Sequence, residues 1–174
     1  MKIGGRFSID RAAITALVVV ILDQLTKEWA FAATTPGDDI RVIPGIKIGQ
    51  VRNEGIAFGF FSGRPWIVFG LMAIALTVLV VFYARHRSRP GLWLATGLLL
   101  GGAIGNAIDR ISLGYVRDFI GLPHFPSFNF ADLCITAGVI ILVLATERAP
   151  AEPETPAEAA PPEPEPEDAQ QRAL

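Results

Sequence analysis

The chain has 174 residues, of which 51% are hydrophobic, and a formal net charge of −2 at pH 7. Residues 147–174 hold eight acidic and two basic side chains, so residues 1–146 carry a net charge of +4. The apolar residues gather in long runs, which favours a lipid bilayer over water as their surroundings. A single cysteine, Cys134, excludes a disulfide framework or a multi-cysteine metal site built from this chain alone.

Four apolar runs, with their flanking turns, approach the roughly 20 residues that cross a ~30 Å hydrocarbon core. These runs cover residues 12–22, 66–83, 92–108 and 133–145. We therefore predict an all-α integral membrane protein with four transmembrane helices. Residues 1–146 form its membrane domain, which includes an extracytoplasmic insert at about residues 33–65.

Basic residues precede the first run and fill the short gap between the second and the third. They are Lys2, Arg6 and Arg11, followed by Arg85, Arg87 and Arg89. Lys and Arg near the ends of spans are enriched on the cytoplasmic side. With four spans, both termini are then cytoplasmic, and residues 33–65 and 111–128 lie outside.

The first run also resembles a cleavable secretory signal. A basic start and an apolar core precede Ala30-Phe31-Ala32, which imitates a small-x-small cleavage site. However, Asp23 and Lys27 interrupt the region where a signal peptide is smooth, and three later spans need an anchor of fixed orientation. We expect this first helix to be retained.

The insert between the first two spans contains a hairpin pattern. Residues 41–43 and 46–51 show the period-two alternation of half-buried strands, and Pro44-Gly45 between them is a turn signal. The sequence therefore predicts a small extracytoplasmic β-sheet that rests on the membrane.

A segment rich in glycine and phenylalanine follows the hairpin and ends at Pro65. Its residues are Gly55, Phe58, Gly59, Phe60, Phe61 and Gly63. It is interpreted either as a flexible segment that dips into the membrane interface or as a set of interfacial aromatic anchors.

Pro, Glu and Ala dominate from residue 149 onward, with no apolar periodicity. This composition buries too little surface to offset the entropy lost when a chain is ordered. We expect residues 147–174 to form a disordered, acidic, Pro-rich cytoplasmic tail.

Polar side chains gather at the predicted outer ends of the helices, where a charged residue within a span costs on the order of 2.5–3.5 kcal/mol and needs a partner or a function. The residues are Asp23, Lys27, Asn106, Asp109, Arg110, Asn129 and Asp132, with Asp118 in the outer loop. For Asp23 and Lys27, four residues apart, we prefer a helix-surface ion pair. Asp109 and Arg110 fit either a structural brace or a role in substrate binding.

Asp118 and Asp132 have no obvious cationic partner on their own helix face. If the fold brings them together, repulsion between like charges makes one carboxyl keep a proton, which leaves a base and an acid in one site. Such a pair is suited to amide hydrolysis by an activated water. The alternative is structural, because an aspartate at a helix start is often an N-terminal cap.

Other hydrolytic schemes lack the residues they need. His86 and His124 are predicted on opposite sides of the membrane without an HExxH pairing, so a zinc site is implausible. Serine catalysis lacks a Gly-x-Ser-x-Gly elbow. Cys134 lies roughly 200° around the helix from Asp132, which indicates a small buried thiol.

Five segments in order resemble the motifs of the prolipoprotein signal peptidases, also called signal peptidase II. They are Asp23-Gln24-Leu25-Thr26-Lys27, Asn53-Glu54-Gly55-Ile56-Ala57-Phe58, Gly101 to Arg110, Val116-Arg117-Asp118-Phe119 and Phe128-Asn129-Phe130-Ala131-Asp132. The similarity covers about residues 11–146. Together with their placement relative to four spans, the five blocks are highly specific.

The resemblance implies a role for each polar residue of this cluster. Asp118 and Asp132 are then the catalytic pair. Asn53, Gly55, Asn106, Arg110 and Asn129 bind substrate or support the pair, and Asp23, Lys27 and Asp109 provide structural support. Gly101, Gly102 and Gly105 either allow a close helix approach or leave room for a substrate helix.

The resemblance also implies an activity and a location. Family members are membrane aspartic endopeptidases, inhibited by globomycin, that cut prolipoproteins immediately before a diacylglyceryl-modified cysteine. We accordingly expect lipidated prolipoproteins and membrane lipid as partners, without nucleic acid, metal or cofactor, for a monomer in the bacterial cytoplasmic membrane with its active site outside.

Two other classes of function fit a cluster of polar residues in a membrane protein. A proton-coupled carrier places its carboxylates near the bilayer midplane with access from both sides. A non-catalytic scaffold uses polar residues only to hold helices together, so replacing Asp118 by Asn would not affect cleavage.

Overall fold

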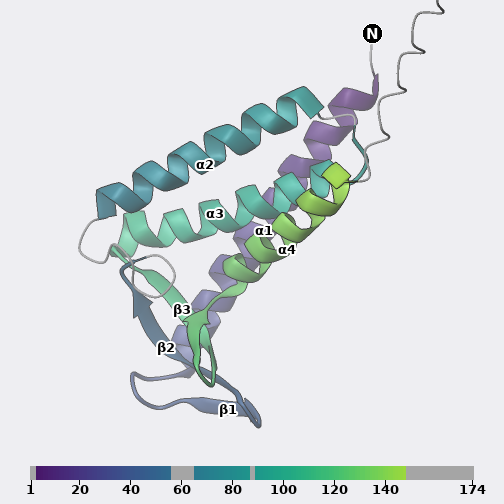
Figure 1. Cartoon of the computed structure of the whole chain (residues 1–174). Coiled ribbons are helices and arrows are strands. Elements are labelled where there is room, and N and C mark those ends of the chain that lie inside the picture. The colour runs from purple at the N-terminus through teal and green to yellow at the C-terminus, as the bar shows by residue number, and fades with distance from the viewer. Residues whose placement is uncertain (1–2, 56–64, 87–88, 148–174) are drawn as a thin grey trace, which may run out of the picture.

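The computed structural model describes residues 3–55, 65–86 and 89–147. They form α1 (Ile3–Ala33), β1 (Ile40–Ile43), β2 (Ile46–Asn53), α2 (Pro65–His86), α3 (Leu92–Leu113), β3 (Val116–Leu122), β4 (Phe125–Phe128) and α4 (Phe130–Glu147). The predictions for residues 56–64 of the Gly- and Phe-rich segment and for the tail from residue 148 lie outside the described residues. Figure 1 shows a helical body with a small sheet at one end.

Three of the four predicted spans are helices long and apolar enough to cross a membrane. They are Phe69–His86 within α2, Leu92–Leu113 and Phe130–Glu147. The helix α1 is longer, with 31 residues, but Asp23, Lys27 and other charged residues interrupt its apolar stretch. A fourth span therefore stays a prediction.

The sheet is antiparallel throughout and has the strand order β1-β2-β3-β4. The predicted hairpin of β1 and β2 is confirmed. The region expected to be an outer loop was predicted wrongly, because residues 116–128 form the hairpin of β3 and β4. Asp118 consequently lies in a strand, where its Cα is paired with that of Val51 of β2.

The end of α3 determines where β3 begins. Gly114 follows α3 in a left-handed conformation, with φ of 82°, and its N–H donates to Arg110 O at 3.1 Å. Glycine adopts this conformation without a steric penalty, so the chain reverses within one residue. As a result, β3 starts beside the last turn of α3, and its second residue, Arg117, reaches back to Asp109 of that turn.

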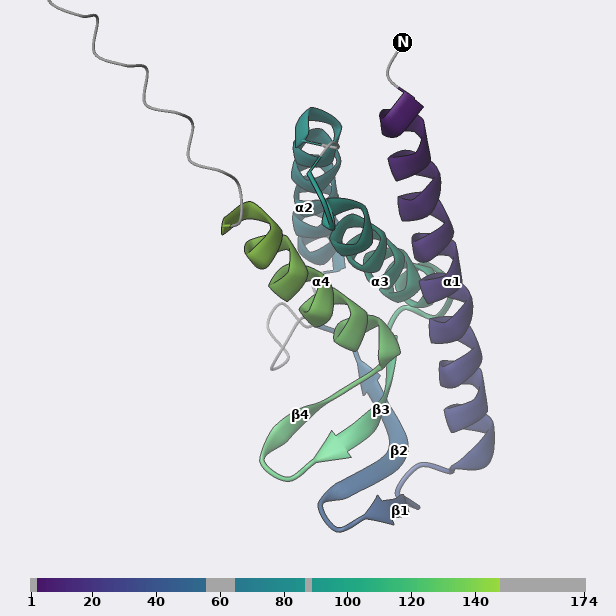
Figure 2. The same ribbon diagram turned by 90° about the vertical axis from the view of Figure 1, so that its right-hand side faces the viewer.

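The helix α3 is central, because α1, α2 and α4 each pack against it (Figure 2). Glycines of α3 allow the close contacts with α1 and α4. A Cβ added at Gly101 would lie 2.6 Å from Val19 Cβ and 2.8 Å from Ala16 O of α1, and one added at Gly102 would lie 2.6 Å from Ala131 O of α4. Of the two interpretations of these glycines, close approach of the chain's own helices is the one observed.

We expect Gly101→Ala to lower the free energy of unfolding by about 1–3 kcal/mol, because its methyl group forces α1 away from α3. Thermal unfolding in detergent micelles measures this. The matched control is Gly70→Ala in α2, where an added Cβ has nothing within 4 Å. Equal stability of both variants would contradict the packing argument.

Candidate active site

Lys27 of α1 is a cation enclosed among helices. Its side chain is 0% exposed, and its Nζ lies 2.8 Å from Asp23 Oδ2 and 3.3 Å from Asp109 Oδ2 of α3. The predicted pairing of Lys27 with Asp23 is confirmed, but its predicted position on the helix surface is wrong. Gly105 of α3 packs directly on the Asp23 carboxylate, so the ion pair lies inside the interface between α1 and α3.

Asp109 connects α3 with β3. Its Oδ2 accepts a hydrogen bond of 2.9 Å from the backbone N–H of Arg117, and its Oδ1 accepts one of 2.9 Å from the Arg117 guanidinium. Together with the contact to Lys27, these bonds support the brace interpretation for Asp109. Arg110 instead points toward the loop after β2, where its Nη2 donates to Gly55 O at 2.8 Å.

Two asparagines lie between Lys27 and the two aspartates of the predicted pair. Asn106 Oδ1 accepts from Lys27 Nζ at 2.9 Å and from Asn129 Nδ2 at 3.1 Å. Lysine is only a donor, so this contact fixes which way the Asn106 amide faces. Its Nδ2 is thereby directed to Asp132 Oδ1, at 2.9 Å.

Asp118 is almost fully enclosed, with 1% of its surface exposed. Its Oδ1 accepts from Asn129 Nδ2 at 2.6 Å and its Oδ2 from Asn53 Nδ2 at 2.9 Å. Burial raises the pKa of Asp118 to about 6; the hydrogen bond from Asn53 opposes this shift and the charge of Asp132 adds to it. Asp118 is therefore half-protonated at about pH 6, so it can donate a proton in mildly acidic solution.

Asp132 occupies the first turn of α4. The backbone N–H of Asn129 donates to Asp132 Oδ2 at 3.1 Å, and the backbone N–H of Asp132 donates to Asn129 Oδ1 at 3.1 Å. This reciprocal pair is a capping box, in which Asn129 is the N-cap. The capping interpretation and the site interpretation are thus compatible, because Asp132 holds the helix start while its other oxygen faces Asn106.

One cavity of about 730 Å³ contains both aspartates. Asn53, Asn106 and Arg110 form its polar end with Asp118 and Asp132. Its other walls are mainly apolar and come from α2, β4 and α4, including Leu71, Met72, Ala75, Phe125, Phe128 and Leu133. A cavity with paired carboxyls at one end and apolar walls suits a peptide bond flanked by apolar groups.

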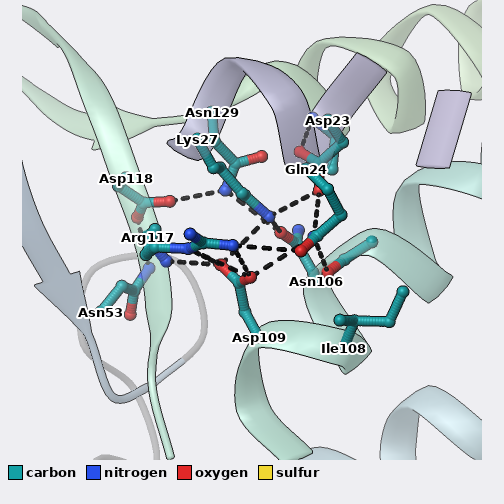
Figure 3. A network of polar contacts seen from close by, with 12 residues as sticks. Asp23, Gln24, Lys27, Asn53, Asn106, Ile108, Asp109, Arg117, Asp118 and Asn129 are labelled. Atoms are coloured by element: carbon teal, nitrogen blue, oxygen red, sulfur yellow. Dashed lines mark hydrogen bonds and ion pairs between the residues drawn. The ribbon is translucent and has the colours of Figure 1, made fainter. Parts of the chain in front are cut away.

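Figure 3 shows how the polar side chains converge from α1, α3, β2, β3 and the start of α4. Within the described ranges, no group of three or more His, Cys, Asp or Glu side chains is arranged to hold a metal. Cys134 is buried, as predicted. Two contributors to this network, Gln24 and Arg117, had no predicted role, although both lie within the matching motifs.

The sequence of the chain is similar to those of a known protein family. Residues 15–147 match the family model described as signal peptidase (SPase) II. A lipoprotein signal peptidase of Syntrophomonas wolfei is 40% identical over 129 residues, which are 74% of this chain and 87% of that protein. That of Gloeobacter violaceus is 38% identical over 154 residues, covering 85% and 87% of the two chains.

Two solved structures described as bacterial membrane enzymes share the fold. One, at 2.3 Å resolution, has a TM-score of 0.74 and 35% identity and covers 83% of this chain and 94% of its own. The other, at 1.9 Å resolution, has a TM-score of 0.72 and 37% identity, with coverage of 80% and 94%. The helices and the sheet are therefore similar in arrangement to those of bacterial membrane enzymes.

Replacing Lys27 by Ala leaves two buried carboxylates without their shared cation. We expect the free energy of unfolding to fall by about 3–5 kcal/mol, as when one partner of a buried ion pair is removed. Thermal unfolding in detergent is the measurement.

Lys47→Ala is the matched control, since Lys47 pairs with Asp39 at 2.6 Å with its side chain 55% exposed. We expect a loss of at most about 1 kcal/mol there. If both variants lost a similar free energy of unfolding, the burial of Lys27 would not increase its contribution to stability.

Proposed function

We propose that this chain, which belongs to the signal peptidase II family, removes signal peptides from prolipoproteins. Asp118 and Asp132 carry out the cleavage by aspartic catalysis. The scissile bond is the one immediately before the diacylglyceryl-modified cysteine. The observation that carries the proposal is that Asn129 bonds both carboxyls, one through its side chain and one through its backbone, at the polar end of a single cavity.

Asp118 and Asp132 together form a catalytic dyad that holds one proton in the active state. The surroundings of the two residues favour Asp118 as the acid. Asp118 is buried in a strand, and burial raises its pKa to about 6. Asp132 lies at the N-terminus of α4, where the helix dipole favours negative charge. Asp132 is therefore the base that takes a proton from the attacking water.

The reaction then follows from these two roles. As Asp132 removes a proton, the water oxygen bonds to the scissile carbonyl carbon, and Asp118 donates its proton to the carbonyl oxygen. When the C–N bond breaks, the proton held by Asp132 passes to the leaving nitrogen. The carbonyl is re-formed as its proton returns to Asp118, which restores the singly protonated pair.

Neutral amides hold the reacting carboxyls in place. Asn53 and Asn129 donate to Asp118, and Asn106 donates to Asp132. These donors orient each oxygen without a cation in direct contact, so the pair can keep its proton. Arg110 lines the cavity beside the two aspartates and also donates to Gly55 O just after β2, so we place both residues at the substrate-binding end of the site.

The helix α1 is proposed as the fourth span. Its charged Asp23 and Lys27 point inward and are 0% exposed, so they do not face lipid. The side chains that do face outward include Ile14, Leu17, Ile21, Leu25 and Trp29, which form an apolar stripe. With four spans and the basic residues on the cytoplasmic side, both termini are cytoplasmic and the dyad lies at the extracytoplasmic face.

This placement suits a lipidated substrate. The polar centre includes side chains of β2 and β3, so it lies where the helices meet the sheet, which is at one end of the helical body in Figure 1. A signal helix and a lipid-bearing cysteine stay in the bilayer there, while water reaches the scissile bond. Clustering at one end also favours a peptidase over a carrier with a site at the midplane.

The catalytic unit is residues 1–146, and the acidic residues 147–174 are a separate tail. The family match supports this division, because it ends at residue 147. The expectation that the protein acts as a monomer stays a proposal.

Asp118→Asn and Asp132→Asn are each expected to lower cleavage of a diacylglyceryl-modified precursor by about 1,000-fold or more, because each removes one member of a unit that acts together. A gel-shift cleavage assay in detergent measures this, with thermal unfolding as the check on folding. The control is Asp39→Asn at the exposed ion pair with Lys47. Full cleavage by either dyad variant would refute the aspartic mechanism.

The pH dependence follows from the position of the proton. Because the pKa of Asp118 is about 6, raising the pH through this value removes the dyad's proton and with it the acid. We expect kcat/KM of the wild type to fall above about pH 6, by about tenfold for each pH unit. An alkaline limb that begins only above about pH 8 would argue against Asp118 as the proton holder.

A further inference from the structure

Arg117 immediately precedes Asp118 in β3, so their side chains lie on opposite faces of the strand. The Arg117 guanidinium contacts two helices. Its Nη1 donates to Glu28 Oε2 at 2.9 Å and its Nη2 to Gln24 Oε1 at 3.0 Å, both on α1. Its Nη2 also donates to Asp109 Oδ1 of α3 at 2.9 Å, as Figure 3 shows for the labelled partners.

The backbone of Arg117 is held by the same carboxylate as its side chain. Its N–H donates to Asp109 Oδ2 at 2.9 Å. Asp109 is 0% exposed and also contacts Lys27, so it is a fixed point within the helices. The strand is therefore held to α1 and α3 one residue before Asp118.

Other contacts hold the sheet as a whole. Gln50 Nε2 of β2 donates to Phe31 O at 2.8 Å and to Thr34 O at 2.5 Å, at the end of α1. The bonds from Asn53 and Asn129 involve the Asp118 carboxyl itself. Among the described residues, Arg117 therefore fixes the strand beside Asp118 without itself bonding the Asp118 carboxyl.

The Arg117 side chain remains a cation in this position. Burial by itself would lower its pKa, but the hydrogen bonds and charge of Asp109, with Glu28, raise the pKa above its ordinary value. Its guanidinium also offers several donors in one plane, which a lysine ammonium does not. One side chain can therefore bond three partners on two helices.

We propose that Arg117 is a positioning residue: its guanidinium clamps β3 to α1 and α3 and thereby sets where the Asp118 carboxyl lies relative to Asp132. This inference rests on the proposed function of the two aspartates. Displacement of a reacting group by about 1 Å can cost about 100-fold in rate, so a clamp one residue away matters for turnover.

Arg52 offers a matched control on the same face of the sheet. Its Cα is paired with that of Arg117 across β2 and β3, but its guanidinium lies over the Tyr115 ring, 5.0 Å from the centroid. Arg52 is exposed, so changing it alters charge and size beside Arg117 without removing the clamp.

The experiment compares Arg117→Lys and Arg117→Gln with Arg52→Lys and Arg52→Gln in the full chain, using a diacylglyceryl-modified precursor. We expect kcat per folded molecule to fall about 10-fold in Arg117→Lys and about 100-fold in Arg117→Gln, with KM within about twofold. The alkaline limb of kcat/KM is expected to move to lower pH, because a displaced Asp118 is less buried and farther from Asp132. Both Arg52 variants should match the wild type.

Lower thermal stability with unchanged kcat and an unchanged pH profile would make Arg117 a structural residue only and would overturn the inference. So would a failure of both Arg117 variants to fold. Asp118→Asn in the same assay separates the two proposals. If it still cleaves, the proposed function fails; if it is inactive while the Arg117 variants turn over normally, only the positioning role fails.

Discussion

A lysine ammonium enclosed among membrane helices requires carboxylates around it, and Lys27 has two. Asp23 belongs to its own helix, whereas Asp109 belongs to α3 and also pairs with Arg117 of β3, so contact between α1 and α3 assembles two cations and two carboxylates of alternating sign. Glycines of α3 make that contact possible, since Gly105 packs directly on the Asp23 carboxylate. Helix packing therefore completes the surroundings of the buried ammonium, because Lys27 would lose Asp109 if α3 moved away from α1.

The asparagines separate this charged centre from the two aspartates of the proposed catalytic pair. Lys27 orients Asn106, and Asn106 and Asn129 in turn orient the two carboxyls through neutral amides. Direct contact with the ammonium would keep a carboxylate ionised. An intervening amide transmits the geometry and leaves protonation to burial and to the repulsion between the two aspartates.

The strand β3 shows why a local pattern missed part of the fold. Both of its faces have partners, because Arg117 contacts α1 and α3 while Asp118 contacts the start of α4. A strand used on both faces lacks the polar and apolar alternation by which strands are predicted. The hairpin of β1 and β2 has that alternation and was predicted correctly. The same double use explains why Arg117 received no role from the sequence.

Local sequence patterns were enough to predict the apolar runs that became α2, α3 and α4, the hairpin of β1 and β2, and the group of polar residues that includes Asp118 and Asp132. These features depend on neighbouring residues and on composition, which a linear pattern records. Three features became visible only in the folded chain: Lys27 is enclosed, Arg117 is linked to it through Asp109, and both aspartates line one cavity. Those contacts join residues far apart in the chain, and they are set by the close approach of helices at glycines and by the register of β3 on β2.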